Sequence, residues 1–70
     1  SQGRDVTIHQ QIVVLEGTIE ITYENHCHRL KAGDCLAMKI EGTNIFENPT
    51  RKLARYLVAS ATEINSRRKT

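Results

Sequence analysis

The 70-residue chain has no long apolar run, few cysteines and, over most of its length, no excess of either charge. No run approaches the roughly 20 apolar residues that span a bilayer, and the first residues lack the apolar stretch of a signal peptide. Residues 1–59 contain seven basic and seven acidic side chains, so the net charge of +2 arises in residues 60–70. We therefore expect no membrane partner and no broad basic surface for binding phosphates.

The two cysteines, Cys27 and Cys35, are too few for the disulfide framework of a small secreted protein. A turn at residues 32–34 would place Cys27 beside a residue near Lys39 rather than beside Cys35. We interpret both as free thiols and expect a cytoplasmic protein.

Apolar and polar residues alternate with the period of a β-strand. Ile19, Ile21 and Tyr23 share one face of the clearest example. Turn-forming residues separate the runs. Six strands are predicted, at residues 10–16, 18–24, 26–31, 35–40, 44–47 and 53–59. This spacing favours an all-β fold, a small antiparallel barrel or sandwich over residues 1–59, with the first two strands joined as a hairpin through Glu16-Gly17.

Residues 60–70 differ from the rest of the chain. Ser60 and Glu63 have the spacing of a helix-capping pair, but the residues that follow are too polar to hold a helix against a core. We expect a frayed helix or a flexible polar tail.

The spacing from Gly33-Asp34 to Asn44, and from there to Asn48-Pro49, resembles the second signature motif of the cupins. Residues 14–21 resemble the end of the first cupin motif, and residues 28–34 resemble the segment between the two. The resemblance covers about residues 10–59 and implies a cupin-type barrel or jelly roll. It says little about chemistry, because cupins include enzymes, storage proteins and sensor domains.

Metal-dependent cupins hold a divalent ion with histidines and a glutamate, and the resemblance shows what this chain has in those positions. The glutamate position is Gln10, and the histidine position of the second motif is Asn44. The two upstream histidine positions fall on residues without an imidazole, Arg4 and Val6 or, with a longer spacing, Gly3 and Asp5. Because an amide is a poor substitute for these ligands, we expect no metal and no cofactor.

Other reactive side chains give little support for catalysis. His26 and His28 point the same way on a strand, but no third ligand can be named, and a structural role is favoured for them and for His9. A nucleophile pair of Cys27 or Cys35 with one of these histidines would lack an orienting group and an oxyanion site. We therefore expect no catalytic residues.

The strand period places Gln10, Asn44, Phe46 and Asn48 on inward-facing positions. Amides among apolar and aromatic walls can hydrogen-bond a small polar ligand. The same residues can equally fill a narrow barrel, with water or backbone groups as their partners. Gln10, Asn44, Phe46 and Asn48 are thus the candidate ligand-binding residues.

Residues 11–58 are similar to the C-terminal cupin domain of bacterial transcriptional regulators with an N-terminal helix-turn-helix domain. The resemblance implies a non-catalytic sensor or dimerisation domain, whose DNA contacts belong to an N-terminal domain absent from this chain. The alternative is a small stand-alone cupin enzyme, an isomerase or dioxygenase, with degenerate metal ligands. A helix-turn-helix pattern in the parent gene would separate the two.

A homodimer is expected because a chain of this size buries only about 60% of its unfolded surface. Residues 12–15 are apolar on both strand faces, which predicts a strand covered by the barrel on one side and by a second chain on the other. We expect the dimer to form through these residues, with exchange of N-terminal strands.

Overall fold

The computed structural model describes residues 4–66, in which every regular element is a β-strand. The strands are β1 (Arg4–Glu16), β2 (Thr18–Tyr23), β3 (His26–Lys31), β4 (Cys35–Ile40), β5 (Asn44–Glu47) and β6 (Arg55–Ser66). All pairings are antiparallel. The prediction of an all-β antiparallel fold is confirmed, and four of the six strands match their predicted bounds within one residue.

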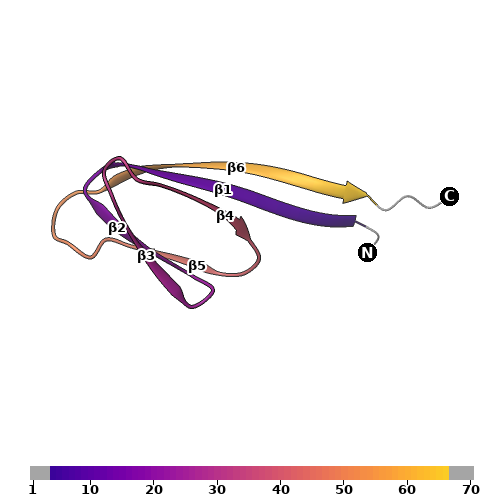
Figure 1. Cartoon of the computed structure of the whole chain (residues 1–70), viewed down its shortest axis with the longest axis horizontal. Helices are drawn as coiled ribbons and strands as arrows, with labels where there is room; N and C mark the ends of the chain where they lie inside the picture. The colour runs from indigo at the N-terminus through magenta and orange to yellow at the C-terminus, as the bar shows by residue number, and fades with distance from the viewer. Residues whose placement is uncertain (1–3, 67–70) are drawn as a thin grey trace.

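The strands form two three-stranded sheets, in the orders β4-β1-β6 and β3-β2-β5 (Figure 1). Within the described residues, no strand of one sheet pairs with a strand of the other, so the two sheets do not form a closed barrel. The predicted hairpin of β1 with β2 is wrong, because these strands belong to different sheets. Gly17 alone connects them, with φ of +80°, and one residue is shorter than the loops that join most hairpins. The chain therefore turns a corner at Gly17 and crosses to the other sheet.

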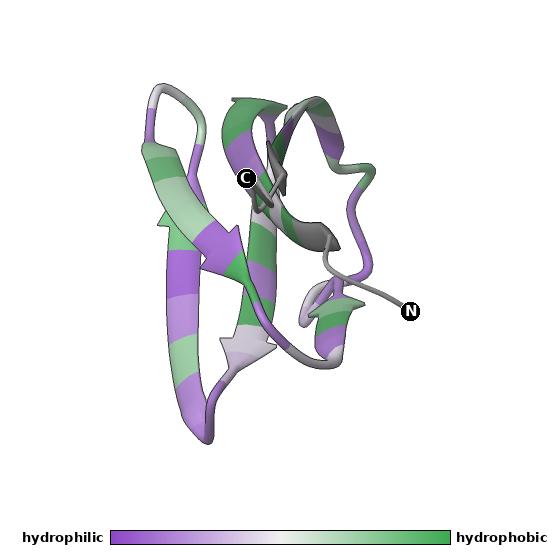
Figure 2. Ribbon diagram, turned by 90° about the vertical axis from the view of Figure 1, so that its right-hand side faces the viewer, coloured by the Kyte–Doolittle hydropathy of each residue, from purple (hydrophilic) through white to green (hydrophobic). Residues whose placement is uncertain are grey.

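The core lies between the two sheets and is small. It consists of five buried side chains, Ile12, Val14, Ile19, Ile21 and Leu30, with Leu36, Met38, Phe46 and Ala54 packed around them. Hydrophobic and hydrophilic bands alternate along the strands (Figure 2), as expected for strands with one buried face. The alternation in the sequence thus correctly identified the inward face of β2, on which Ile19 and Ile21 are buried.

The turn at residues 32–34 attaches the end of β3 to β1. The amide of Gly33 donates to the carbonyl of Val14 over 2.9 Å, and the amide of Val14 donates to the carbonyl of Asp34 over 3.0 Å. The Asp34 carboxylate accepts a hydrogen bond from the Lys31 amide over 2.8 Å. Gly33 has φ of +95°, a conformation that glycine adopts without steric cost. The Gly-Asp pair therefore fixes the crossing from one sheet to the other.

The two terminal strands are longer than predicted and form an arm that extends beyond the rest of the sandwich (Figure 1). β1 begins at Arg4, and β6 pairs with it from Arg55 to Ser66. Residues 60–63, expected to start a frayed helix, belong to β6 instead. The apolar residues Val6 and Ile64 lie opposite each other in this register. Residues 60–66 are thus a strand because they pair with β1, and the sequence of the tail alone does not indicate that pairing. Residues 67–70 of the predicted tail lie outside the described residues.

Residues 12–15 are covered on one face by their own chain, and the predicted cover of the other face by a second chain stays a prediction. Ile12 and Val14 are buried in the core, whereas Leu15 on the opposite face is 47% exposed. The second sheet covers one face of β1, and β4 and β6 occupy its edges. The apolar outer face of β1 is therefore an exposed surface within the described chain.

Candidate functional site

Gln10 lies on the inner face of β1, in the phase of the buried residues Ile12 and Val14. Its Nε2 donates to Oγ of Ser60 on β6 over 3.4 Å, a long hydrogen bond. Its Oε1 is buried and has no hydrogen-bond partner. Since a buried acceptor without a donor costs about 1–3 kcal/mol, this oxygen is an unsatisfied acceptor within the described chain.

Asn44 presents a second amide of the same kind on the other sheet. It begins β5 and lies opposite Tyr23 of β2. Its Oδ1 is also buried without a partner. Asn44, at the position that resembles the histidine position of the cupin motif, thus supplies a carbonyl oxygen that is able to accept a hydrogen bond but does not ionise.

Phe46 lies two residues further along β5 and stacks on Tyr56 at the start of β6. The ring centroids are 5.6 Å apart, and the ring planes differ by 21°. The two rings belong to a recess of about 170 Å³ whose other walls are Ile19, Glu47, Asn48 and Ala54. Such an offset aromatic pair stabilises the structure beyond its buried area. Phe46 thereby connects the second sheet to β6.

Asn48 does not continue the inward phase of β5, which ends at Glu47. Its side chain is exposed and closes the turn that precedes β6. Oδ1 accepts hydrogen bonds from the amide and the hydroxyl of Thr50, both at 2.8 Å, and Nδ2 donates to the Lys52 carbonyl over 2.7 Å. An asparagine that bonds backbone two residues on is a common turn device. The inward position predicted for Asn48 is therefore corrected to an exposed one.

Three of the four candidate ligand-binding residues line recesses of the described chain. Phe46 and Asn48 line the recess beside β6, whereas Gln10 lines a different recess, of about 300 Å³, with residues of β4. The two amides share a chemical property instead: each has a buried acceptor oxygen without a donor. Gln10 and Asn44 thus lie one on each sheet, and Phe46 stacks on Tyr56 at the start of β6.

A further recess, which the sequence did not indicate, lies between the β2–β3 hairpin and β4. It has a volume of about 380 Å³, and its polar walls include Tyr23, His26 and His28. The Tyr23 hydroxyl donates to the carbonyl of Lys39 on β4. Burial, followed by the carboxylates of Glu24 and Glu41, raises the pKa of Tyr23 above its ordinary value of 10.0. His26 is exposed and His28 is half-buried, as the sequence suggested for two surface or half-buried histidines.

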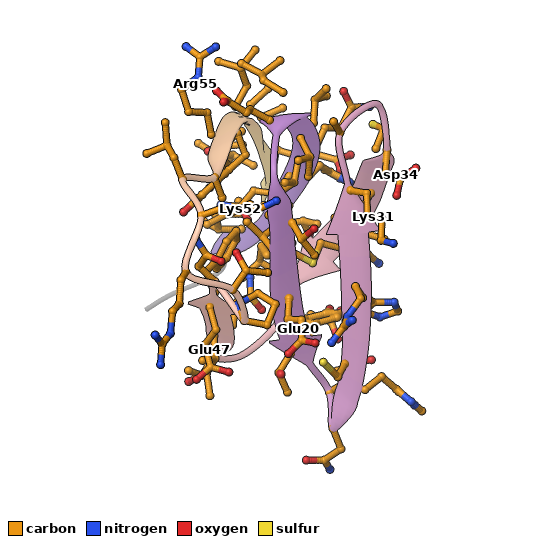
Figure 3. The ribbon with its side chains drawn as sticks, turned by 90° about the vertical axis from the view of Figure 1, so that its left-hand side faces the viewer. Glu20, Lys31, Asp34, Glu47, Lys52 and Arg55 are labelled. Carbon is orange, nitrogen blue, oxygen red and sulfur yellow. The ribbon has the colours of Figure 1, made fainter. Side chains whose placement is uncertain are left out.

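Charged side chains are on the outer surface. Arg29 bonds Glu20 across β3 and β2 at 2.7 Å, and Arg55 bonds Glu16 across β6 and β1 at 3.0 Å. Glu20 lies opposite Glu47 in the sheet register, and Figure 3 shows both carboxylates on the same side of the sheet. No charged or polar residue of the described chain is buried as a whole, although single oxygen atoms of Gln10 and Asn44 are. An anionic or cationic ligand would therefore find no buried counter-charge here.

Cys27 and Cys35 are both exposed and carry free thiols. Among residues 4–66, no three histidine, cysteine or acidic side chains lie close enough together to hold a metal ion. Nor does this part of the chain contain a helix long and apolar enough to cross a membrane.

Comparison with protein-family models, curated proteins and solved structures finds no match for this chain. The chemistry from which a function can be inferred is therefore that of the chain's own residues. Its main components are two buried amide oxygens, one aromatic pair and the exposed edges of two small sheets.

Proposed function

We propose that the chain is a non-catalytic, cupin-type sensor and dimerisation domain of a bacterial transcriptional regulator, acting in the cytoplasm. Its sensing function is the binding of a small polar effector between the sheets. The observation that carries this proposal is the pair of buried, unpartnered oxygens on Gln10 and Asn44. DNA binding would belong to a separate helix-turn-helix domain, as the resemblance of residues 11–58 implies.

The strand connections support a jelly roll as the finer description of the fold. Four of the five connections, all except the β2–β3 turn, cross between the two sheets. A jelly roll has eight antiparallel strands in two facing sheets, with such crossings between them. The motif residues Asp34 and Asn48 both have local structural roles, because each uses its side chain to close a turn. Six strands with these connections are consistent with most of a cupin domain.

The amides define the chemistry of the effector. Two carbonyl oxygens without donors favour a molecule that carries N–H or O–H groups, such as a polyol or a small amide. Carboxamides do not titrate near neutral pH, so they are suited to hydrogen bonding and not to general acid–base catalysis. Gln10 and Asn44 lie on different sheets. An effector that bonds to both would tie the sheets together and stabilise the sandwich.

Isosteric replacement of the amides tests this function. In the absence of effector, we expect Asn44→Leu and Gln10→Met to keep or raise the free energy of unfolding, by up to about 1 kcal/mol, because each removes an unsatisfied buried oxygen. Thermal unfolding with glycerol, glucose and acetamide as probes should show stabilisation of the parent protein at saturating concentration. Both variants should lose most of that probe-dependent stabilisation.

The matched control is Gln11→Met, since Gln11 is the exposed neighbour of Gln10 on the same strand. It should retain the response to the probes. The proposal would be wrong if Gln10→Met and Asn44→Leu both destabilised the protein and left its response to every probe equal to that of the control. In that case, the amides would be structural.

A further inference from the structure

The outer edge of β6 is the longest unpaired backbone edge in the part of the chain that the structure describes. β6 has 12 residues and pairs with β1 on one side only. Figure 1 shows its other side open along the length of the arm. An open edge exposes a row of N–H and C=O groups that another strand can pair with.

This edge has none of the features that usually prevent such pairing. Residues 56–62 contain no charge, no proline and no glycine, whereas protected edges carry lysine, proline, an edge bulge or an inward charge. Leu57 is 59% exposed and Val58 is 43% exposed, on opposite faces of the strand. An uncharged seven-residue segment of this composition associates readily with another strand. The edge of residues 56–62 is therefore available for pairing with another strand.

We propose that two copies of the chain pair antiparallel through their β6 strands, with Ala59 at the two-fold axis, to form one six-stranded sheet in the order β4-β1-β6-β6-β1-β4. This proposal rests on the dimerisation part of the proposed function and identifies its surface. The proposed interface is the β6 edge, whereas the sequence suggested residues 12–15; of these, Ile12 and Val14 are buried in the core of their own chain and Leu15 is exposed on the outer face of β1.

The charges at the two ends of β6 select this register. A two-fold axis through Ala59 places Arg55 opposite Glu63 of the second copy, twice in the dimer, on the outer face of the sheet. Within its own chain Arg55 already bonds Glu16, and Glu63 bonds His9. Cross-strand pairs of opposite charge stabilise a sheet, and like charges directly opposite destabilise it. Across the interface, the outer face would thus carry a row of four ionisable groups: Glu16 and Arg55 of one copy, followed by Glu63 and His9 of the second copy.

The residues between these charges fit the same register. Leu57 lies opposite Ala61 of the second copy, and Ala59 lies opposite its own equivalent, so the one large side chain on this face meets a small one. A second copy of the chain is favoured over an unrelated strand because the charge pattern of β6 is complementary to itself when read in the antiparallel direction.

The exposed area of the chain also suits a dimer. The accessible surface is 5395 Å², whereas a compact monomer of 7.9 kDa exposes about 4,400 Å² by the usual scaling with mass. The excess is about 1,000 Å² per chain. A standard protein interface buries about 800 Å² per partner. The elongated chain thus exposes enough extra surface for an interface of ordinary size.

Charge reversal tests the pairing. In sedimentation equilibrium of the full chain at low salt, Arg55→Glu and Glu63→Arg should each weaken the dimer about tenfold or more, because two attractive pairs become repulsive. The double variant Arg55→Glu with Glu63→Arg should recover most of the parent affinity. Circular dichroism of each variant at high concentration monitors folding, and an additive loss in the double variant would overturn the Arg55–Glu63 register.

Cross-linking tests the axis directly. In a background with Cys27→Ser and Cys35→Ser, Ala59→Cys should give a disulfide-linked dimer on mild oxidation, since opposed residues on paired strands lie within disulfide range. The matched control Ala61→Cys should not, because its two copies would be offset by four residues, roughly 13 Å along the strands. Equal cross-linking of both variants would overturn the register.

A monomer at about 100 μM would overturn the proposal as a whole. So would a dimer that the Ala59→Cys substitution fails to cross-link and that is broken instead by Leu15→Lys on the outer face of β1. Neither result bears on effector binding, which the probe-dependent stabilisation of the monomeric or dimeric protein reports separately. Failure of the interface and failure of the sensor function are therefore distinguishable.

Discussion

At the residue scale, Gly17 shows what a local pattern can and cannot reveal. The Glu16-Gly17 pair correctly predicted a turn, but not the kind of turn. A Cβ atom at Gly17 would lie 2.4 Å from the carbonyl oxygen of Leu53 and 2.9 Å from Cα of Ala54. Those backbone atoms belong to the segment before β6, which is 36 positions away in the sequence. Such a long-range approach has no signature in the residues next to Gly17.

Alanine substitutions at three glycines should therefore differ in cost. Gly17→Ala should lower the free energy of unfolding by more than about 2 kcal/mol, because it combines an unfavourable positive φ with a clash against backbone. Gly33→Ala also has a positive φ but meets no atom within 4 Å, so a loss of about 1 kcal/mol is expected. Gly42→Ala, with open space and no positive φ, should be neutral or slightly stabilising.

Urea unfolding monitored by circular dichroism gives the three values. The order of the losses is the decisive result, because it separates the steric contribution at Gly17 from the conformational one at Gly33. Equal losses at Gly17 and Gly33 would show that the backbone of residues 53 and 54 moves away from the new methyl group at position 17 without a loss of stability.

The candidate site was also partly readable at this scale. Strand phase correctly placed Gln10, Asn44 and Phe46 on inner faces, because period-two alternation is a property of consecutive residues. It failed for Asn48, whose side chain bonds to Thr50 and Lys52. It also gave no indication of the recess beside His28, because that recess depends on β4, which belongs to the other sheet.

At the scale of elements, strand positions were predictable and strand pairing was not. The bounds of β3, β4 and β5 were predicted to the residue, since turn residues and alternation mark them locally. The assignment of β1 and β2 to different sheets depends on packing of their inner faces around a common core. The extension of β6 to Ser66 depends on its register with β1, which is equally non-local.

The β2–β3 hairpin offers a test at this scale. Its two-residue loop is Glu24-Asn25, and both residues have positive φ, 52° and 65°, which is the requirement of a type I′ turn. Asn-Gly is the preferred sequence for that turn, because glutamate tolerates positive φ poorly. The double substitution Glu24→Asn with Asn25→Gly should raise the free energy of unfolding by about 1 kcal/mol, or the melting temperature by roughly 4–8 °C.

Glu24→Ala serves as the control for that change. It removes the same carboxylate but supplies neither the short polar side chain of asparagine, which is tolerated in the left-handed conformation, nor the glycine at position 25, so it should not reproduce the gain. A comparable gain in the control would show that the charge of Glu24, and not the backbone conformation, limits the stability of the hairpin.

At the scale of the whole molecule, the shape and the core are inconsistent with high stability as a single chain. The principal extents are 55 × 21 × 14 Å, and the radius of gyration is 15.3 Å, against about 11 Å for a compact domain of 70 residues. Only five side chains of the described residues form the buried core. The arm of β1 and β6 places apolar residues such as Val6 and Ile64 where no second layer of the same chain covers them.

A chain of this shape should depend on association for its stability. If folding is coupled to dimerisation, a tenfold rise in protein concentration should raise the melting temperature by roughly 5 °C, because association then contributes about 1.4 kcal/mol per tenfold change. Differential scanning calorimetry between about 10 and 1,000 μM would detect this shift. The Arg55→Glu variant should reach the same melting temperature only at higher concentration, since it weakens the interface and removes the exposed Arg55–Glu16 pair without touching the core. A melting temperature independent of concentration would mean that five buried side chains and two three-stranded sheets suffice for the fold of the isolated chain.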